Sequence, residues 1–359
     1  MTNFDDLKLA VEAMSGGKNT VILDDLGMPS IVVPFPKLKY SDVIAGGSQD
    51  VLPAFIVDGA EIDVIYQSKY QNIVINNRAY SLPMKDPGVY VTFDAALNAC
   101  RSKGAGWHLQ TNALWAAIAL WCKKNGTMPR GNNNYGADYS QPHEKGVPTA
   151  KETSGSFRPL RTATGSGPAS WYHNYDLSGI ADLNGNIWEW CSGMRLQNGE
   201  IQIIPNGNAM KIDSNMGATS TEWKAILQDG SLVDPGTPGT LKFDYTATPA
   251  AGTGNIELSD TILNPQPDDV AYGYKTFETL TAHTGITVPQ ILKGLGLFPV
   301  DSDHGGDGFY FRNNGERLPF RGGIWFSASN AGVFNLSLSN PRSYSNSAHG
   351  FRSAFYGNL

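Results

Sequence analysis

Apolar residues recur at helical spacing in three parts of the chain. Residues 4–14, 93–103 and 112–124 each place apolar side chains three and four positions apart, which predicts three helices. The third segment begins after Thr111, a typical N-cap residue, and ends before Gly126, a typical C-terminal stop. Because this segment is apolar on nearly all sides, we expect it to be the buried central helix.

Short apolar runs elsewhere predict strands. TVIL (20–23) and SIVVPF (30–35) flank the turn-like sequence DDLGMP, which is typical of a hairpin. The cluster Gly46-Gly47-Ser48 that follows is typical of a linker. We therefore expect residues 1–48 to form a small N-terminal attachment or oligomerisation unit and residues 49–359 to form the main domain. Helices combined with many short strands indicate the α+β fold class.

Residues 321–355, RGGIWFSASNAGVFNLSLSNPRSYSNSAHGFRSAF, combine core-like and surface-like features. In NLSLSN the alternation of apolar and polar residues is strict, so Leu336 and Leu338 should point to one face of a strand. Asn335, Ser337 and Ser339 should then point to the other face, outward to solvent. The buried anchors of the segment are expected to be Trp325, Phe334, Leu336, Leu338 and Phe351. An ordinary edge strand with a polar face is the alternative.

Composition and charge narrow the class of partner. The 359 residues carry a formal net charge of -6 and no visible run of Lys and Arg, which argues against a nucleic-acid binder. The N-terminus has acids where a secretion signal needs bases, and the apolar run 113–122 is too short to cross a bilayer. We expect no membrane insertion, and a protein that stays in the cytoplasm unless it leaves as part of a larger particle.

Residues that could carry catalysis or hold a metal are sparse. Cys100, Cys122 and Cys191 show no metal-binding spacing and are expected to be buried free thiols. The histidines are scattered singly, and DSDHGGDG (301–308) lacks the spacing of a calcium loop, so we expect it to be a turn. Trp188 and Trp190 are expected in the core. We therefore predict no catalytic residues and no metal site from the spacing of side chains.

Three segments in order, ADLNGNIWEW, LPFRGGIWF and GFRSAF, resemble the formylglycine-generating-enzyme branch of the C-type lectin fold. The resemblance covers residues 50–359 and thins out across 196–310, which it implies is a long insertion. The oxidase members use a pair of cysteines after the RGG segment, and this chain has no cysteine after Cys191, so the resemblance does not imply an enzyme. It does allow a calcium ion at the turn Asn184–Glu189. The alternative is that Glu189 only accepts backbone hydrogen bonds.

The chain resembles more closely the variable proteins of diversity-generating retroelements, which include phage tropism determinants. The frame RGG-W…SNAGVF-L-L…PRS…GFR carries this resemblance and implies that 321–355 is a variable region. Residue types between the frame positions are all reachable from an Asn codon by changing its first two bases. The ligand-binding positions that the resemblance implies are Ile324, Phe326, Ser327, Asn335, Ser337, Ser339, Asn340, Tyr344, Asn346, Ser347, Ala348 and His349.

The implied function is recognition without chemistry. A phage or prophage tail-tip protein would use the variable positions to bind a cell-surface protein or glycan, and the resemblance allows a homotrimer on the particle. Ile324, Phe326, Tyr344 and His349 would supply contact area, and the Ser and Asn positions would supply adaptable hydrogen bonds. Two alternatives remain open. One is a cofactor-dependent oxidase of the parent family, and the other is a structural or glycan-binding particle protein without diversification.

Overall fold

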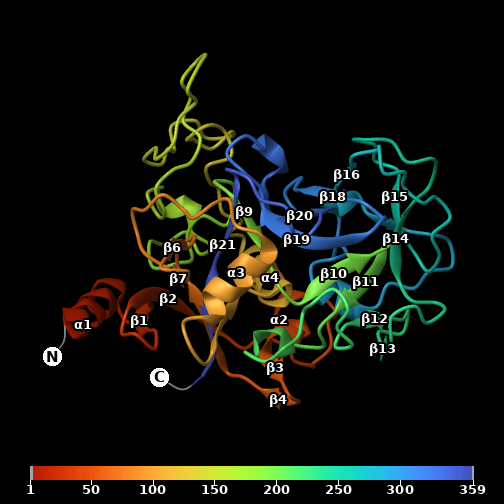
Figure 1. The fold of residues 1–359 in the computed structure, drawn as a ribbon, viewed down its shortest axis with the longest axis horizontal. Coiled ribbons are helices and arrows are strands. Elements are labelled where there is room, and N and C mark those ends of the chain that lie inside the picture. The colour runs from red at the N-terminus through yellow and green to blue at the C-terminus, as the bar shows by residue number, and fades with distance from the viewer. Residues whose placement is uncertain (1–2, 358–359) are drawn as a thin grey trace.

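The structure is a computed structural model that describes residues 3–357, and it has the α+β architecture expected from the sequence (Figure 1). The three predicted helices are confirmed. The hydroxyl of Thr111 accepts a hydrogen bond from the Leu114 N–H at 3.0 Å, and Gly126 ends the same helix with a φ of 67°. The helices are α1 (Asn3–Ser15), α2 (Tyr40–Val43), α3 (Phe93–Arg101), α4 (Asn112–Asn125) and α5 (Gln290–Gly294).

A five-stranded sheet joins the beginning and the end of the chain in the order β1-β2-β5-β22-β8. The closing strand β22 pairs antiparallel with β5. The predicted hairpin is confirmed, but β2 pairs with β5 in the same sheet, so residues 20–36 are not the separate unit that we expected. The role of residues 1–48 in attachment or oligomerisation stays a prediction. The strands are β1 (Thr20–Leu23), β2 (Pro29–Pro36), β5 (Val64–Ser68), β8 (Trp107–Leu109) and β22 (Ser353–Phe355).

The second sheet contains the predicted variable segment. Its strand β20 lies between β18, which is parallel, and β19, which is antiparallel (Figure 1). Residues 196–310 continue this sheet, because β10 pairs with β19 and β16 pairs with β18. The strands that bear on the site are β9 (Trp188–Trp190), β10 (Met194–Gln197), β16 (Gly273–Thr276), β18 (Gly308–Phe311), β19 (Glu316–Gly322), β20 (Gly332–Asn340) and β21 (His349–Phe351).

Other short strands extend the larger sheet or form small hairpins. The two hairpins pair β3 with β4 and β6 with β7, and the remaining strands continue the larger sheet beyond β10. These strands are β3 (Ile56–Val57), β4 (Ala60–Glu61), β6 (Ile73–Ile75), β7 (Arg78–Tyr80), β11 (Glu200–Ile203), β12 (Lys224–Ile226), β13 (Leu232–Val233), β14 (Lys242–Tyr245), β15 (Ile256–Ser259) and β17 (Thr281–Ala282).

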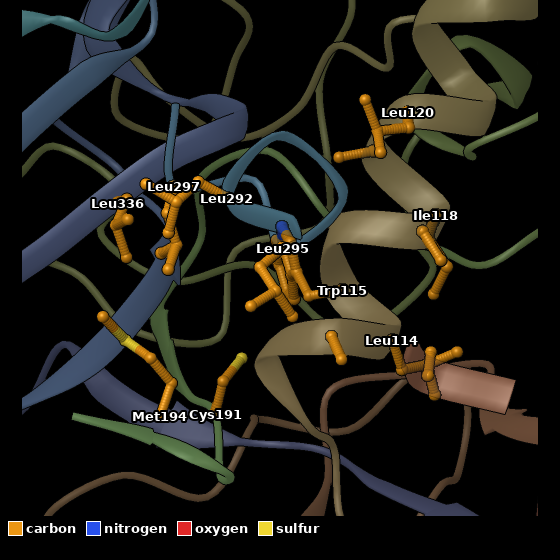
Figure 2. Close-up of a cluster of buried hydrophobic side chains, with 14 of the residues drawn as sticks. Leu114, Trp115, Ile118, Leu120, Cys191, Met194, Leu292, Leu295, Leu297 and Leu336 are labelled. Carbon is orange, nitrogen blue, oxygen red and sulfur yellow. The ribbon is translucent and has the colours of Figure 1, made fainter. Parts of the chain in front are cut away.

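The helix α4 is the centre of the core, as its all-round apolar surface predicts. Figure 2 shows Trp115 of α4 beside Leu295, and the same core cluster includes Leu114 of α4 and Leu336 of β20. The indole N–H of Trp115 donates to the carbonyl of Val333 at 2.7 Å, which fixes β20 against the helix. The five anchors expected in the variable segment, Trp325, Phe334, Leu336, Leu338 and Phe351, are all buried.

A buried ion pair fixes the end of the chain. Arg352 and Glu189 are 0% and 1% exposed, and two guanidinium N–H groups donate to the two carboxylate oxygens at 2.5 Å. Arg352 also donates to the carbonyls of Ala181 at 3.0 Å and Asp182 at 3.2 Å. The strand that follows the variable region is thereby joined to β9 and to the turn that precedes it.

We predict that Arg352→Ala lowers the free energy of unfolding by about 3–5 kcal/mol, because it leaves the Glu189 carboxylate buried without a counter-charge. Arg158→Ala is the control, since it removes a pair with Glu152 at the surface and should change stability little. Urea unfolding of both variants measures the difference. Equal losses would contradict the importance of the buried pair.

Candidate ligand-binding surface

The predicted ligand-binding positions divide into two groups by exposure. Five of the side chains are buried, and the others are partly or largely exposed. The buried group is Ile324, Asn335, Ser337, Ala348 and His349. The accessible group is Phe326, Ser327, Ser339, Asn340, Tyr344, Asn346 and Ser347, of which Phe326 is the most exposed at 54%.

The alternation along β20 exists, but its polar face does not point to solvent. Leu336 lies opposite Phe309 and belongs to the main core, whereas Ser337 lies opposite Tyr310 and Phe320 on the other face. Asn335 is 0% exposed and Ser337 is 3% exposed. Our expectation that these two side chains face outward is therefore wrong. The edge-strand alternative is also wrong, because β20 has a neighbouring strand on each side.

Two aromatic side chains explain this burial. Trp188 of β9 and Tyr310 of β18 have ring centroids 6.1 Å apart, although β19 and β20 lie between their strands. Three strand spacings amount to about 14 Å, so the two rings must lean toward each other over the intervening strands. They meet on the face that carries Asn335 and Ser337. Trp188, which we expected in the core, is only partly buried, whereas Trp190 is fully buried.

These rings belong to a continuous aromatic layer, which we call the aromatic roof. Tyr310 also contacts the rings of Tyr272 and Tyr274, at 5.6 and 5.1 Å between centroids. On the other side, Phe320 contacts His349 at 4.4 Å, and Tyr344 contacts His349 at 5.0 Å. The aromatic roof consists of Tyr272, Tyr274, Tyr310, Trp188, Phe320, Tyr344 and His349.

The two loops that flank β20 meet beside the aromatic roof. Ile324 and Ala348 pack in one small cluster with Trp325 and against the edge of Trp188. Asn346 accepts hydrogen bonds through its side-chain oxygen from the Ala348 N–H at 2.7 Å and lies at 2.5 Å from a ring nitrogen of His349. The structure therefore brings the predicted positions of both loops together. Phe326 extends from this cluster to the surface, where its ring stacks with Tyr135 at 6.4 Å.

The start of β20 is fixed by an acid that we expected only in a turn. The buried carboxylate of Asp307 accepts a hydrogen bond from the Phe334 N–H at 2.7 Å. A Cβ atom at Gly332 would lie 2.1 Å from an oxygen of the same carboxylate, so this contact requires glycine. Burial raises the pKa of Asp307 well above its usual range. The glycine in the frame SNAGVF indicates that another group approaches the backbone at this position, but the sequence does not reveal that the group is the Asp307 carboxylate.

The turn considered for calcium is occupied by protein hydrogen bonds. The Glu189 carboxylate is paired with Arg352 and accepts from the Gln71 amide at 3.0 Å. The Asn184 side-chain nitrogen donates to the Pro129 carbonyl at 2.8 Å, and its oxygen accepts from Asn133 at 3.0 Å. With their polar atoms engaged, Asn184 and Glu189 do not fit a calcium site.

The cysteines have the environment of core residues. Cys100, Cys122 and Cys191 are buried free thiols, as expected, and burial raises the pKa of each. Their thiolate forms are therefore disfavoured at neutral pH. Within residues 3–357, no three His, Cys, Asp or Glu side chains are grouped so that they could hold a metal ion.

Comparisons with known proteins give distant structural similarities. No family model matches the chain, and no curated protein matches it. Treponema denticola variable protein 1 is similar at a TM-score of 0.36 and 12% identity, over 94% of this chain and 99% of that one. PvdO from Pseudomonas aeruginosa is similar at a TM-score of 0.33 and 12% identity, over 94% of this chain and 98% of that one. The Major Tropism Determinant U1 variant is similar at a TM-score of 0.30 and 11% identity, over 94% of this chain and 71% of that one. Likeness at this distance assigns no residue a role.

We predict that Ser337→Tyr destabilises the fold and Ser339→Tyr does not. Ser337 lies buried beside the aromatic roof, where added volume should cost about 1–3 kcal/mol, whereas Ser339 is partly exposed and should change stability by no more than about 0.5 kcal/mol. Urea denaturation of both variants tests this. A well-tolerated Tyr at position 337 would show that the roof opens freely.

Acid should lower the free energy of unfolding, because His349 is buried. Burial lowers the pKa of His349 from 6.5 to about 3. Below pH 6.5 the unfolded chain takes up this proton and the folded chain does not, so the free energy of unfolding falls as the pH falls toward 3. We predict that His349→Asn reduces the loss between pH 7 and 4.5 by about 2 kcal/mol. Urea unfolding of the parent chain and the variant at both pH values measures the difference, and identical losses in the two would contradict the role of His349.

Proposed function

We propose that the protein binds a macromolecular target through the accessible variable positions and carries out no chemical conversion there. The observation that supports this most directly is the division within one segment. Its apolar frame residues are buried in the core, while seven of the side chains between the frame positions reach the surface from both flanking loops and from the end of β20. Such a segment can exchange its exposed side chains without disturbing the packing that positions them.

The exposed side chains suit contact better than catalysis. Serine, asparagine and tyrosine dominate the accessible group, which is the composition of antibody-like surfaces. Ile324 and His349, which we expected to act as anchors, are buried, so Phe326 and Tyr344 are left as the large contact residues. Small side chains bury little apolar area, and each Å² contributes about 25 cal/mol. A single copy should therefore bind weakly.

The finer proposal is that this surface is diversified by a retroelement and serves attachment of a phage or prophage particle to a cell. The buried variable positions would then modify the surface from beneath, because Asn335 and Ser337 lie under the aromatic roof. Several copies on one particle, as in a trimer, would compensate for weak single contacts, since linked sites raise avidity by roughly 10² to 10⁴. No helix within residues 3–357 is long and apolar enough to cross a membrane.

The oxidase alternative has less support from the geometry. Thiol chemistry needs an accessible thiolate, and each of the three cysteines is buried with a raised pKa. Binding in the absence of chemistry requires only the exposed groups that are present.

The DNA beside the coding sequence tests diversification. We predict a near-identical copy of the segment that encodes residues 321–355, with Asn codons at the variable positions, and a nearby reverse transcriptase gene. In sequenced populations, substitutions should be confined to the variable codons and spare Trp325, Leu336 and Leu338. Absence of such a copy would exclude diversification and leave only a fixed binding surface.

Affinity tests the binding surface itself. We predict micromolar or weaker binding of the monomer to cells that carry the target, and tighter binding of a multivalent display by a factor of roughly 10² or more. Phe326→Ser and Tyr344→Ser should each weaken target binding by the displayed protein, and urea unfolding should show that each variant remains folded. Nanomolar binding by the monomer, with no gain on display, would contradict this account.

A further inference from the structure

Two arginines lie at the end of the variable strand without an acidic partner. Arg312 follows β18 and Arg317 belongs to β19, so both precede the variable segment in the chain. Within residues 3–357, neither guanidinium group lies within 4.0 Å of a carboxylate, and both side chains are partly exposed. Most other arginines of the chain pair with an acid. This pair is therefore unusual in the molecule.

One amide oxygen holds the two positive charges together. The side-chain oxygen of Asn314 accepts from Nε of Arg312 at 3.2 Å and from Nη2 of Arg317 at 2.8 Å, so the two guanidinium groups are neighbours. Arg312 also donates to the carbonyl of Asp268 at 3.0 Å, and Arg317 donates to the carbonyl of Asn314 at 2.8 Å. These neutral acceptors orient the groups but do not cancel their charge.

Neither Asp268 nor Glu316 lies within 4.0 Å of these guanidinium groups, although the Asp268 carboxylate acts on Arg317 from a greater distance and opposes the lowering of its pKa. The Asp268 carboxylate accepts from the Asn314 amide at 2.9 Å, and Glu316 pairs with Arg195 and Arg342. Burial, together with the neighbouring Arg312, lowers the pKa of Arg317 to about 10. Two like charges held side by side repel each other, and an anion between them would relieve that repulsion.

The pair also adjoins the variable surface. Nη1 of Arg317 lies 3.4 Å from the carbonyl oxygen of Ser339, and the N–H of Arg312 donates to the carbonyl of Leu338 at 3.1 Å. The hydroxyl groups of Ser337 and Ser339 form a hydrogen bond of 2.9 Å. The side-chain nitrogen of Asn340 donates to the same Ser339 hydroxyl at 3.3 Å. Both Ser339 and Asn340 are accessible variable positions, and they lie next to arginines that are outside the variable segment.

We propose that Arg312 and Arg317 form a fixed anion-binding corner of the target surface, and that its ligand is a carboxylate group of the target. Guanidinium groups match the planar carboxylate through paired hydrogen bonds. The inference rests on the proposed function, because the carboxylate belongs to the target. The fixed arginines supply charge, and variation at Ser339 and Asn340 adjusts which carboxylate-bearing group fits beside them. The carboxylate can come from an acidic sugar or from an acidic side chain.

The full chain with labelled arginines allows a direct test by nuclear magnetic resonance of the Nε–H groups. The probes are a sialylated oligosaccharide and its neutral counterpart, and a glutamate-rich peptide and its glutamine counterpart. We expect one or both acidic probes to shift the Arg312 and Arg317 signals, and the neutral probes to leave them unchanged. The acidic probe that acts identifies the source of the carboxylate. If neither acidic probe shifts the signals at millimolar concentration, the proposal is overturned.

Variants show whether the two side chains make the site. Arg312→Gln and Arg317→Gln should each weaken binding of the active probe about tenfold, Arg→Lys variants should weaken it less, and Arg158→Gln should not change it. Urea unfolding confirms that each variant is folded. Unchanged probe binding in the double Gln variant would overturn the assignment. Failure here would leave the effects of Phe326→Ser and Tyr344→Ser on target binding intact, so the two proposals fail separately.

Discussion

The buried ion pair between Arg352 and Glu189 is the contact on which the proposed binding surface depends. The segment 321–355 runs through β20, pairs with β9 of the second sheet through β21, and must then end beside β5 in the first sheet. Arg352 makes this return possible. The Glu189 carboxylate and the backbone carbonyls of residues 181 and 182 take the place of the water that would solvate its guanidinium group. A charge so deeply buried is stable only when all of these partners are in place.

With both ends of the segment fixed, the chain between them has little freedom in its backbone. Arg321 at the other end donates two hydrogen bonds to the Asn112 side chain of α4, at 3.0 and 2.7 Å. The indole of Trp115 and the carboxylate of Asp307 hold β20 itself. Under the proposed function, side chains can vary without moving the backbone, because these buried polar contacts position it.

The surface that results has three physically different parts. Beneath the aromatic roof, small polar residues fill the space left by large rings, so a change there alters how the roof sits. The flanking loops present Phe326 and Tyr344 as adaptable contacts. At the end of β20, Arg312 and Arg317 form a charged corner that the variable segment does not encode. Under the proposed function, apolar contact is therefore adjustable, whereas the charge is fixed.

Local sequence determined the helices, the hairpin, the anchors and the two faces of β20. Caps such as Thr111 and the period-two pattern around Leu336 act over a few residues, so they can be recognised without knowing the fold. Tertiary structure alone decided what covers the polar face. Trp188 and Tyr310 lie 122 positions apart in the chain, and no local pattern indicates that their rings meet over Asn335. For the same reason the sequence could not reveal that Asp307 holds β20, or that Arg312 and Arg317 stand together without an acid. Such contacts depend on which strands become neighbours, and this is set by the packing of the whole chain.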